Sequence, residues 1–253
     1  MNDKVVMLPM SSKKCNMQNK KCDYKTLAMM TLYSNFTPIE MQDEKGVYET
    51  YRFLYKNKII KFTKEIEEIS NNKINTIIKN MRKLSNLDGD LVMANVNEAW
   101  EIYYVINYAD EKDRKYVTIE DDILRMLINA CSSHAIKIYI LLKYMCGDKE
   151  KKMTREFIAK QIGLSSSKGV DIVSDCTSVL ASSGFINKRK EYNYGNDVKC
   201  DVYYSVNSHD KWLEIKNRNW FWLWVNLFTH INVSIYYYLF ILSIYLVPPN
   251  CPF

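Results

Sequence analysis

The sequence has little glycine and histidine, and residues 219–253 carry no charged side chain. Its 253 residues include seven Gly and three isolated His. Neither the phosphate-binding pattern G-x-x-x-x-G-K-[ST] nor the dinucleotide-binding pattern G-x-G-x-x-G occurs, and no His pair has zinc-binding spacing. These absences disfavour an ATP-driven motor, a dinucleotide enzyme and a metalloenzyme. We expect a protein that is not an enzyme, with no catalytic residue, metal or cofactor.

The cysteines give no indication of a disulfide framework. Their number, seven, is odd, no C-x-x-C pair occurs, and the first residues do not form a signal-peptide pattern. The sequence therefore predicts reduced thiols and a cytoplasmic location.

The charge is only mildly basic, with 35 Lys or Arg against 29 Asp or Glu and a net charge of +6. This excess permits a polyanionic partner without requiring one. Its distribution is uneven, because residues 151–218 are clearly basic and residues 219–253 are uncharged. The position of the basic groups therefore matters more than their sum.

Two segments of the chain repeat the same order of residue types. The first runs from residue 59 to 107 and the second from 152 to 207. Each begins near a Thr-basic-Glu triplet and ends in Tyr-Tyr-x-aliphatic-Asn. Thr63 and Thr154 can each cap a helix, and apolar residues at helical spacing predict a second helix after a turn. Strand-forming residues follow, so each copy predicts helix, turn, helix and β-hairpin.

These elements predict an α+β fold with two tandem winged helix-turn-helix domains, each a three-helix core plus a β-hairpin wing, and a hydrophobic C-terminal segment. The first helix of each core is expected upstream of its copy, at 47–55 and 135–145. The predicted parts are a flexible N-terminal segment (1–23), a first winged-helix domain (24–110), a linking strand and helix (111–131), a second winged-helix domain (132–215) and an uncharged hydrophobic tail (219–253).

A helix-turn-helix places its second helix in the major groove of DNA, where Asn, Lys, Arg and Thr can read base edges or contact phosphate. The polar face of that helix in the first copy has these residue types. The alternative is that this polar face is simply exposed to solvent. The same order of helix, turn, helix and hairpin in both copies favours DNA binding over this alternative. The candidate contacts there are Lys73, Asn75, Thr76, Lys79 and Arg82.

In the second copy, candidate contacts lie at the helix entrance, on the helix and in the wing. Hydroxyl and ammonium groups at a helix entrance suit phosphate, and a basic aromatic hairpin suits the DNA backbone or minor groove. Asp171 and Asp175 oppose phosphate binding, and either read cytosine amino groups or face protein. The candidates are Ser165, Ser166, Ser167, Lys168, Ser174, Thr177, Lys188, Arg189, Lys190, Tyr192 and Lys199.

The second copy also resembles a known family. The run from Thr154 to Ser165, followed by Ile172 to Leu180 and by Gly184-Phe185-Ile186, resembles the winged helix-turn-helix of bacterial regulators and replication proteins. Two such units in tandem, over roughly residues 45–215, resemble the plasmid and phage replication initiator (Rep) proteins of low-GC bacteria. The resemblance implies binding to repeated origin sequences and recruitment of host replication proteins. One departure is the longer turn in the second copy, residues 165–169.

The uncharged tail has three interpretations. Residues 220–247 are apolar and long enough to cross a bilayer, and basic residues precede them. Asn226, His230 and Asn232 oppose this, since polar groups are costly inside a membrane. The tail can instead be a packing element or the product of a shifted reading frame.

The sequence as a whole indicates a sequence-specific protein that binds double-stranded DNA at repeated origin or operator sites and initiates plasmid or phage replication. A transcriptional or plasmid copy-number regulator is the alternative, because the same domains bind operators. A membrane-attached interaction protein is a second alternative. A homodimer, host replication proteins and membrane contact through 220–247 are the further partners considered.

Overall fold

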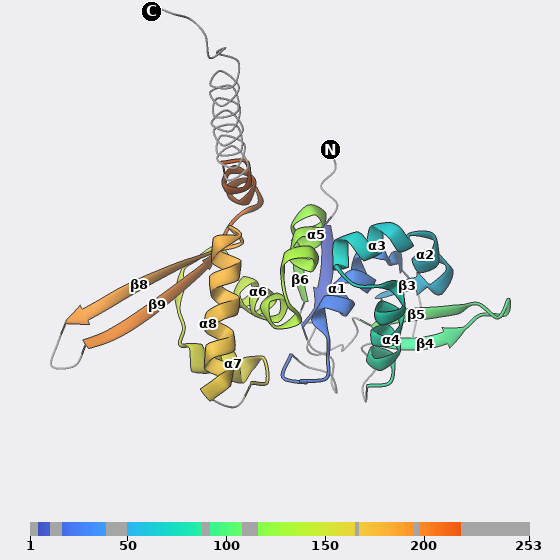
Figure 1. The fold of residues 1–253 in the computed structure, drawn as a ribbon, viewed down its shortest axis with the longest axis horizontal. Coiled ribbons are helices and arrows are strands. Elements are labelled where there is room, and N and C mark those ends of the chain that lie inside the picture. The colour runs from blue at the N-terminus through green and yellow to red at the C-terminus, as the bar shows by residue number, and fades with distance from the viewer. Residues whose placement is uncertain are drawn as a thin grey trace, which may run out of the picture. The chain divides into compact units, whose positions relative to one another are not determined.

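The fold is mixed α+β, with helices and small antiparallel sheets. The computed structural model describes residues 5–10, 17–38, 50–87, 92–107, 116–164, 167–194 and 198–218. The chain divides into one unit of residues 1–209 and another of residues 210–253. Residues 210–218 of the second unit are helical. All elements named below belong to the first unit (Figure 1).

The first half of this unit combines a helical cluster with a four-stranded sheet in the order β2-β3-β5-β4. Helices α1, α3 and α4 contact one another. The elements are α1 (Tyr24–Tyr33), β2 (Asn35–Pro38), β3 (Thr50–Tyr55), α2 (Lys56–Lys61), α3 (Thr63–Ser70), α4 (Ile74–Ser85), β4 (Val92–Val96) and β5 (Ile102–Asn107).

The prediction of a helix at 47–55 is wrong for its described residues, because residues 50–55 form strand β3 between β2 and β5. Aromatic residues at every second position, Tyr51, Phe53 and Tyr55, favour a strand over a helix. The first helix of this half is α1 instead. Apart from Lys25 it is buried on all sides.

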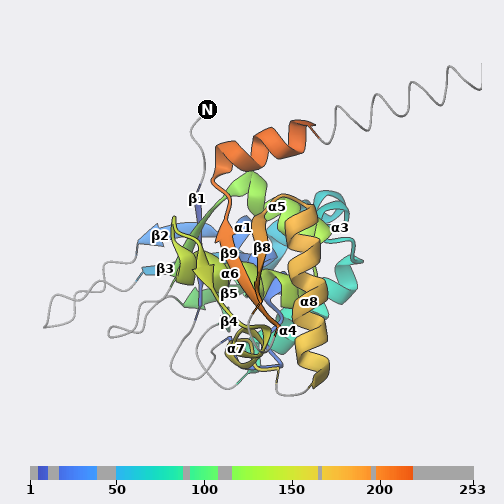
Figure 2. The ribbon, with the colours of Figure 1, turned by 90° about the vertical axis from the view of Figure 1, so that its left-hand side faces the viewer.

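The second half has a three-stranded sheet in the order β7-β9-β8. Figure 2, turned so that this half faces the viewer, shows α8 running beside the hairpin β8–β9. The elements are α6 (Ser133–Cys146), β7 (Lys151–Lys152), α7 (Arg155–Gln161), α8 (Ser167–Ser182), β8 (Ile186–Tyr194) and β9 (Val198–Val206).

The two halves share much of their order of elements. In the second half, α6 is followed by strand β7, two helices and a hairpin, and β7 pairs with the last strand of that hairpin, β9. In the first half, α1 is followed by strands β2 and β3, three helices and a hairpin, and β3 pairs with the last strand, β5. The matching tyrosines Tyr104 and Tyr204 are both buried, at 2% and 0% exposure, on the strands β5 and β9. Thr154 caps α7 as predicted, since its hydroxyl accepts a hydrogen bond from the Phe157 N–H at 3.1 Å. Thr63 instead donates to the Ile60 carbonyl at 2.7 Å.

The N-terminal residues do not fit the expected flexible segment. Residues 5–9 form β1 (Val5–Pro9), which pairs antiparallel with β6 (Tyr116–Glu120). Alternate residues of β1, Val6 and Leu8, are fully buried. This period-two burial explains the strand, because one face packs on the core.

Helix α8 begins earlier than the predicted turn allows, and its buried stripe includes Thr177, which was predicted as a DNA contact. Ser167, Lys168 and Gly169 are helical rather than part of the turn. A Cβ atom at Gly169 would lie 2.8 Å from the Leu164 Cβ, so glycine permits the turn to pack closely on the helix. Spacings of three and four place the buried stripe at Gly169, Val173, Cys176, Thr177 and Leu180.

Helix α5 (Asp121–Ala130) lies between β6 and α6 and contacts α3 of the first half. The Arg125 guanidinium is 2.7 Å from carboxylate oxygens of both Glu65 and Asp121. The Tyr33 hydroxyl donates to the same Glu65 oxygen at 2.8 Å. Hydrogen bonds from Arg125 and Tyr33 hold the pKa of Glu65 below its usual range. This network links α5 to α1 and α3.

Within the described residues, no helix combines the length and the apolar character that crossing a bilayer requires. The hydrophobic segment 220–247, on which the membrane interpretation depends, lies outside them.

Candidate nucleic-acid interface

Helix α4 presents a more uniformly basic surface than helix α8. Ile77, Met81 and Leu84 are buried and fix one face of the helix against the body. No acidic residue occurs between positions 73 and 85. The opposite face exposes Lys73, Asn75, Thr76, Lys79, Arg82 and Lys83.

The cations of α4 differ in their surroundings. Glu67 caps the helix, since its carboxylate accepts a hydrogen bond from the Ile74 N–H at 2.8 Å. The Lys73 ammonium is 3.6 Å from Glu67, although its side chain is 85% exposed. Within the described part of the chain, no carboxylate lies at ion-pair distance from Lys79 or Lys83. These two lysines are therefore available to an external anion.

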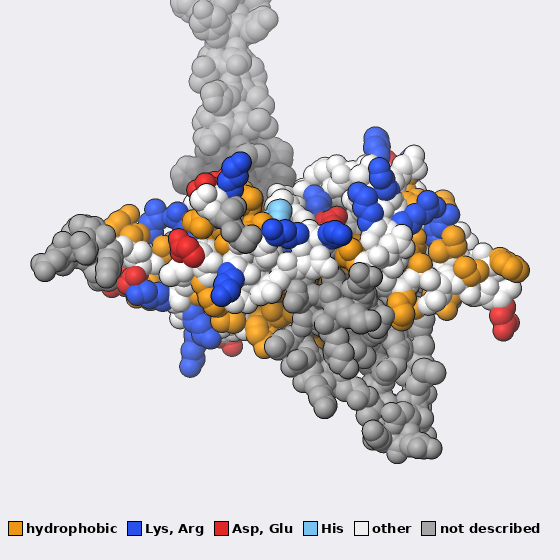
Figure 3. Space-filling view, turned by 90° about the horizontal axis from the view of Figure 1, so that it is seen from below, with side chains coloured by type: hydrophobic (Ala, Val, Ile, Leu, Met, Phe, Trp, Pro, Cys, Tyr) orange, Lys and Arg blue, Asp and Glu red, His pale blue; other side chains and the backbone are white. Residues whose placement is uncertain are grey.

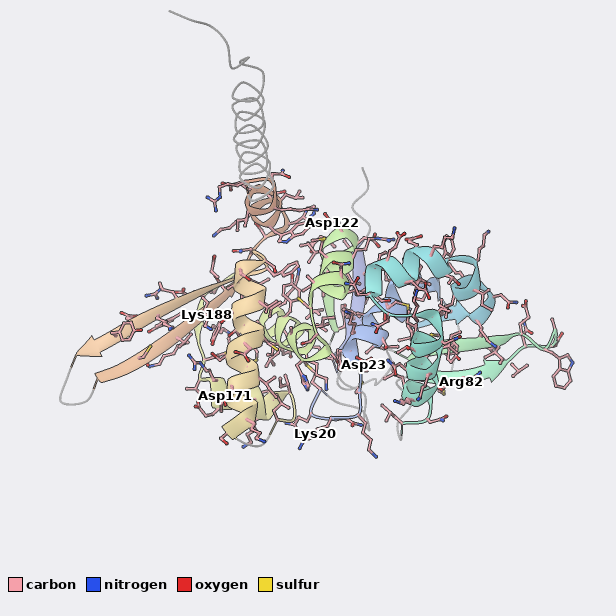
Figure 4. All side chains as sticks on the ribbon, viewed as in Figure 1. Lys20, Asp23, Arg82, Asp122, Asp171 and Lys188 are labelled. Carbon is pink, nitrogen blue, oxygen red and sulfur yellow. The ribbon has the colours of Figure 1, made fainter. Side chains whose placement is uncertain are left out.

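Helix α8 presents a different exposed face. Lys168, Asp171, Asp175 and Ser178 are all exposed, so one cation accompanies two carboxylates. Asp171, labelled in Figure 4, lies in the N-terminal part of α8. A face of mixed sign attracts phosphate less than α4 does.

Two predicted contacts, Thr177 and Lys188, bind each other instead of facing outward. Thr177 is fully buried, which corrects the prediction that its hydroxyl contacts DNA. The Lys188 ammonium donates to the Thr177 hydroxyl at 2.9 Å and lies 3.4 Å from that of Ser178. Burial, with the nearby charges of Arg155 and Lys190, lowers the pKa of Lys188. Lys188 thus joins the hairpin to α8 and is a structural group, contrary to the prediction of a free DNA contact.

The charge of Arg189 is also compensated within the protein. Its guanidinium lies 2.8 Å from Glu150 and 3.4 Å from Glu191, and it stacks over the Tyr203 ring at 4.5 Å. The Arg189 side chain is still 51% exposed, so its contact with DNA stays a prediction. Lys190 and Tyr192 are exposed on β8.

The remaining predicted residues are placed only in part. Ser167 and Lys168 are exposed in the first turn of α8, and Ser174 is half-buried, with its carbonyl accepting bonds from the Thr177 and Ser178 hydroxyls. Ser165, Ser166 and the side chain of Lys199 lie outside the described residues.

Sequence reasoning missed several exposed lysines. Lys83 follows Arg82 on α4, Lys160 lies on α7, and Lys20 and Lys21 precede α1. The adjacent pair Lys20-Lys21 was visible in the sequence, but the position of this segment beside the turn after α7 was not. Figure 3 shows Lys and Arg side chains over both halves of the unit, with fewer Asp and Glu between them.

Comparisons with protein-family models, curated proteins and solved structures give no match.

Proposed function

We propose that the chain is a sequence-specific DNA-binding protein built from two tandem winged-helix domains, and that it initiates plasmid or phage replication at repeated origin sites. The observation that carries this proposal is α4. It is the second helix of a helix-turn-helix, it contains no carboxylate, and it exposes Lys79, Arg82 and Lys83 together with Asn75 and Thr76.

The repeated order of elements supports the winged-helix assignment. In both halves the two helices are followed by a hairpin whose last strand pairs with an earlier strand, as β5 does with β3 and β9 with β7. A hairpin beside a recognition helix is suited to follow the DNA backbone. Two such modules in one chain suit two adjacent half-sites.

The two helices have different roles in this proposal. Helix α4 supplies positive charge and donors for base edges and phosphate, because Asn pairs with adenine and Arg or Lys with guanine. Helix α8, with Asp171 and Asp175, accepts hydrogen bonds from cytosine amino groups. Its phosphate contacts must come from neighbouring elements.

A transcriptional or copy-number regulator is the second candidate function, and the same α4 surface supports it. A protection footprint on the DNA that carries this gene tests both candidates. We expect several protected repeats, next to an AT-rich stretch if the site is an origin. The absence of any protected site would rule out both functions.

Deleting only this gene from its replicon separates the two candidates. An initiator predicts that copying of the replicon stops and returns when the intact gene is supplied in trans. A replicon that still copies, at a changed number, would contradict the initiator and support the regulator. Host replication proteins and a second copy of the chain are the protein partners that the initiator proposal includes.

A further inference from the structure

Residues 17–23 form an ordered segment between β1 and α1. Met17 and Cys22 are buried, at 5% and 2% exposure, while Lys20 and Lys21 between them are exposed. Asp23 ends the segment and caps α1, accepting hydrogen bonds from the Lys25 N–H at 3.1 Å and the Thr26 hydroxyl at 2.6 Å. The segment therefore presents two adjacent ammonium groups from a fixed backbone.

A buried lysine of α6 binds two backbone carbonyls of this segment. Lys137 lies on α6 and is only 1% exposed. Its ammonium donates to the carbonyls of Met17 at 3.2 Å and Asn19 at 2.9 Å, and lies 5.3 Å from the centre of the Tyr24 ring. A buried ammonium is costly unless it is hydrogen-bonded, so these carbonyls fix the position of the segment.

The segment also touches the helix-turn-helix of the second half. Gly163, in the turn after α7, has a φ angle of +81°. A Cβ atom there would lie 2.0 Å from the Gln18 carbonyl oxygen. The glycine is therefore required both by its backbone conformation and by the close approach of the segment.

This contact creates an open groove of about 780 Å³ between the segment and the two helices. Lys20 borders it from the segment, Lys160 from α7 and Ser167 from α8, while Glu156 contributes one carboxylate. Figure 4 shows Lys20 on the side of the unit where α7 lies. Among the described residues that line the groove, Lys20 and Lys160 carry ammonium groups and Glu156 a carboxylate. The groove lies next to α8, whose own exposed face is mixed in charge.

We infer that residues 17–23 are a DNA-phosphate-binding element of the second helix-turn-helix, with Lys20 and Lys21 as the contacts and Lys137 as the residue that positions them. The inference rests on the proposed function. The segment supplies the positive charge that α8 lacks, because Asp171 and Asp175 offset Lys168 there. The DNA backbone beside α8 is its ligand.

The test is the salt dependence of binding to a 30-base-pair AT-rich duplex, measured with the full chain by fluorescence anisotropy. Each phosphate contact contributes about −0.9 to the slope of log K against log salt concentration. Lys20→Ala/Lys21→Ala should therefore make the slope shallower by about 1.8. Between 50 and 200 mM salt the wild type should lose about 12-fold more affinity than this variant.

Two further variants complete the design. Lys149→Ala/Lys151→Ala removes the same charge from two exposed positions, one just before β7 and one on it, and should leave most of the slope in place. Lys137→Met should reproduce the shallower slope, and adding it to Lys20→Ala/Lys21→Ala should change little more, because both act on one element. If Lys137→Met does not fold, the Lys20→Ala/Lys21→Ala variant still decides the question.

The outcomes separate the inference from the proposed function. A wild type with no salt-sensitive affinity overturns the DNA-binding function and the inference with it. A wild type that binds, with an unchanged slope in Lys20→Ala/Lys21→Ala, overturns the inference alone. A slope that changes equally in the Lys149→Ala/Lys151→Ala control also overturns it, since the effect would then reflect net charge only.

Discussion

Replacing Gly163 by Ala should undock residues 17–23 from the second helix-turn-helix. The added Cβ atom would lie 2.0 Å from the Gln18 oxygen, whereas real Cβ contacts stay above 3.0 Å, so the two backbones must separate by at least about 1 Å. Gln18 lies between Met17 and Asn19, whose carbonyls hold the Lys137 ammonium. The same movement therefore weakens both hydrogen bonds to the buried lysine.

Gly147 provides a matched control. It also has a positive φ angle, +55°, but among the described residues beyond its chain neighbours no atom lies within 4 Å of a Cβ built there. Gly147→Ala thus measures the backbone cost alone, about 1–3 kcal/mol for a non-glycine residue in such a conformation. Gly163→Ala adds the cost of leaving a buried charge without its partners, about 3 kcal/mol.

Urea unfolding of both variants measures this difference, with the free energy of unfolding taken from the midpoint at constant m value. We expect Gly163→Ala to be less stable than Gly147→Ala by about 3 kcal/mol. This extra destabilisation of Gly163→Ala should become smaller when Lys137→Met is also present, because the buried ammonium that loses its hydrogen bonds is then absent. Equal destabilisation by the two glycine variants would refute the proposed coupling between Gly163, Gln18 and Lys137.

Two further predictions concern titratable groups. Burial, together with the Lys137 charge, holds the pKa of His134 below its ordinary value. As the pH falls, the His134 imidazole therefore binds a proton in the unfolded chain before it does so in the folded chain, near pH 6.5. His134 thus favours the folded state at pH 7.5, and this contribution to stability is lost as the pH falls below about 6.5. Urea unfolding at pH 7.5 and 5.5 should show a smaller pH dependence for His134→Gln, and an identical dependence in both proteins would contradict the assignment. Burial also raises the pKa of the Cys131 thiol to about 11, whereas Cys200 is exposed. A brief N-ethylmaleimide pulse at pH 8, followed by peptide mass spectrometry, should label Cys200 well before Cys131, and equal labelling rates would count against the buried position of Cys131.

Local features of the fold were predictable from the sequence. The Thr154 cap and the buried stripe of α4 depend on residues within one or two helical turns of each other. Strand β3 was missed because its apolar residues are also compatible with a short helix. The partners that decide between them, β2 and β5, are set by tertiary pairing.

The partners of several basic side chains lie far away in the sequence. Arg189 pairs with Glu150, which lies 39 positions earlier, and Lys137 binds a carbonyl 120 positions earlier. No periodic pattern indicates such contacts. The burial of Thr177 was missed for a different reason. Its polar side chain indicated an exposed position, whereas the structure buries Thr177 and leaves the apolar Val179 42% exposed.

The central claim is that α4 binds DNA through its exposed cations. The salt dependence of binding by Lys79→Ala/Arg82→Ala/Lys83→Ala tests it most directly. Three lost phosphate contacts should make the slope of log K against log salt shallower by about 2.7, so that the wild type loses about 40-fold more affinity than the variant between 50 and 200 mM. The control Lys61→Ala/Lys149→Ala/Lys151→Ala, with equal charge loss at exposed positions outside α4, should keep a slope near that of the wild type. An α4 variant that binds with the wild-type affinity and slope would contradict the account.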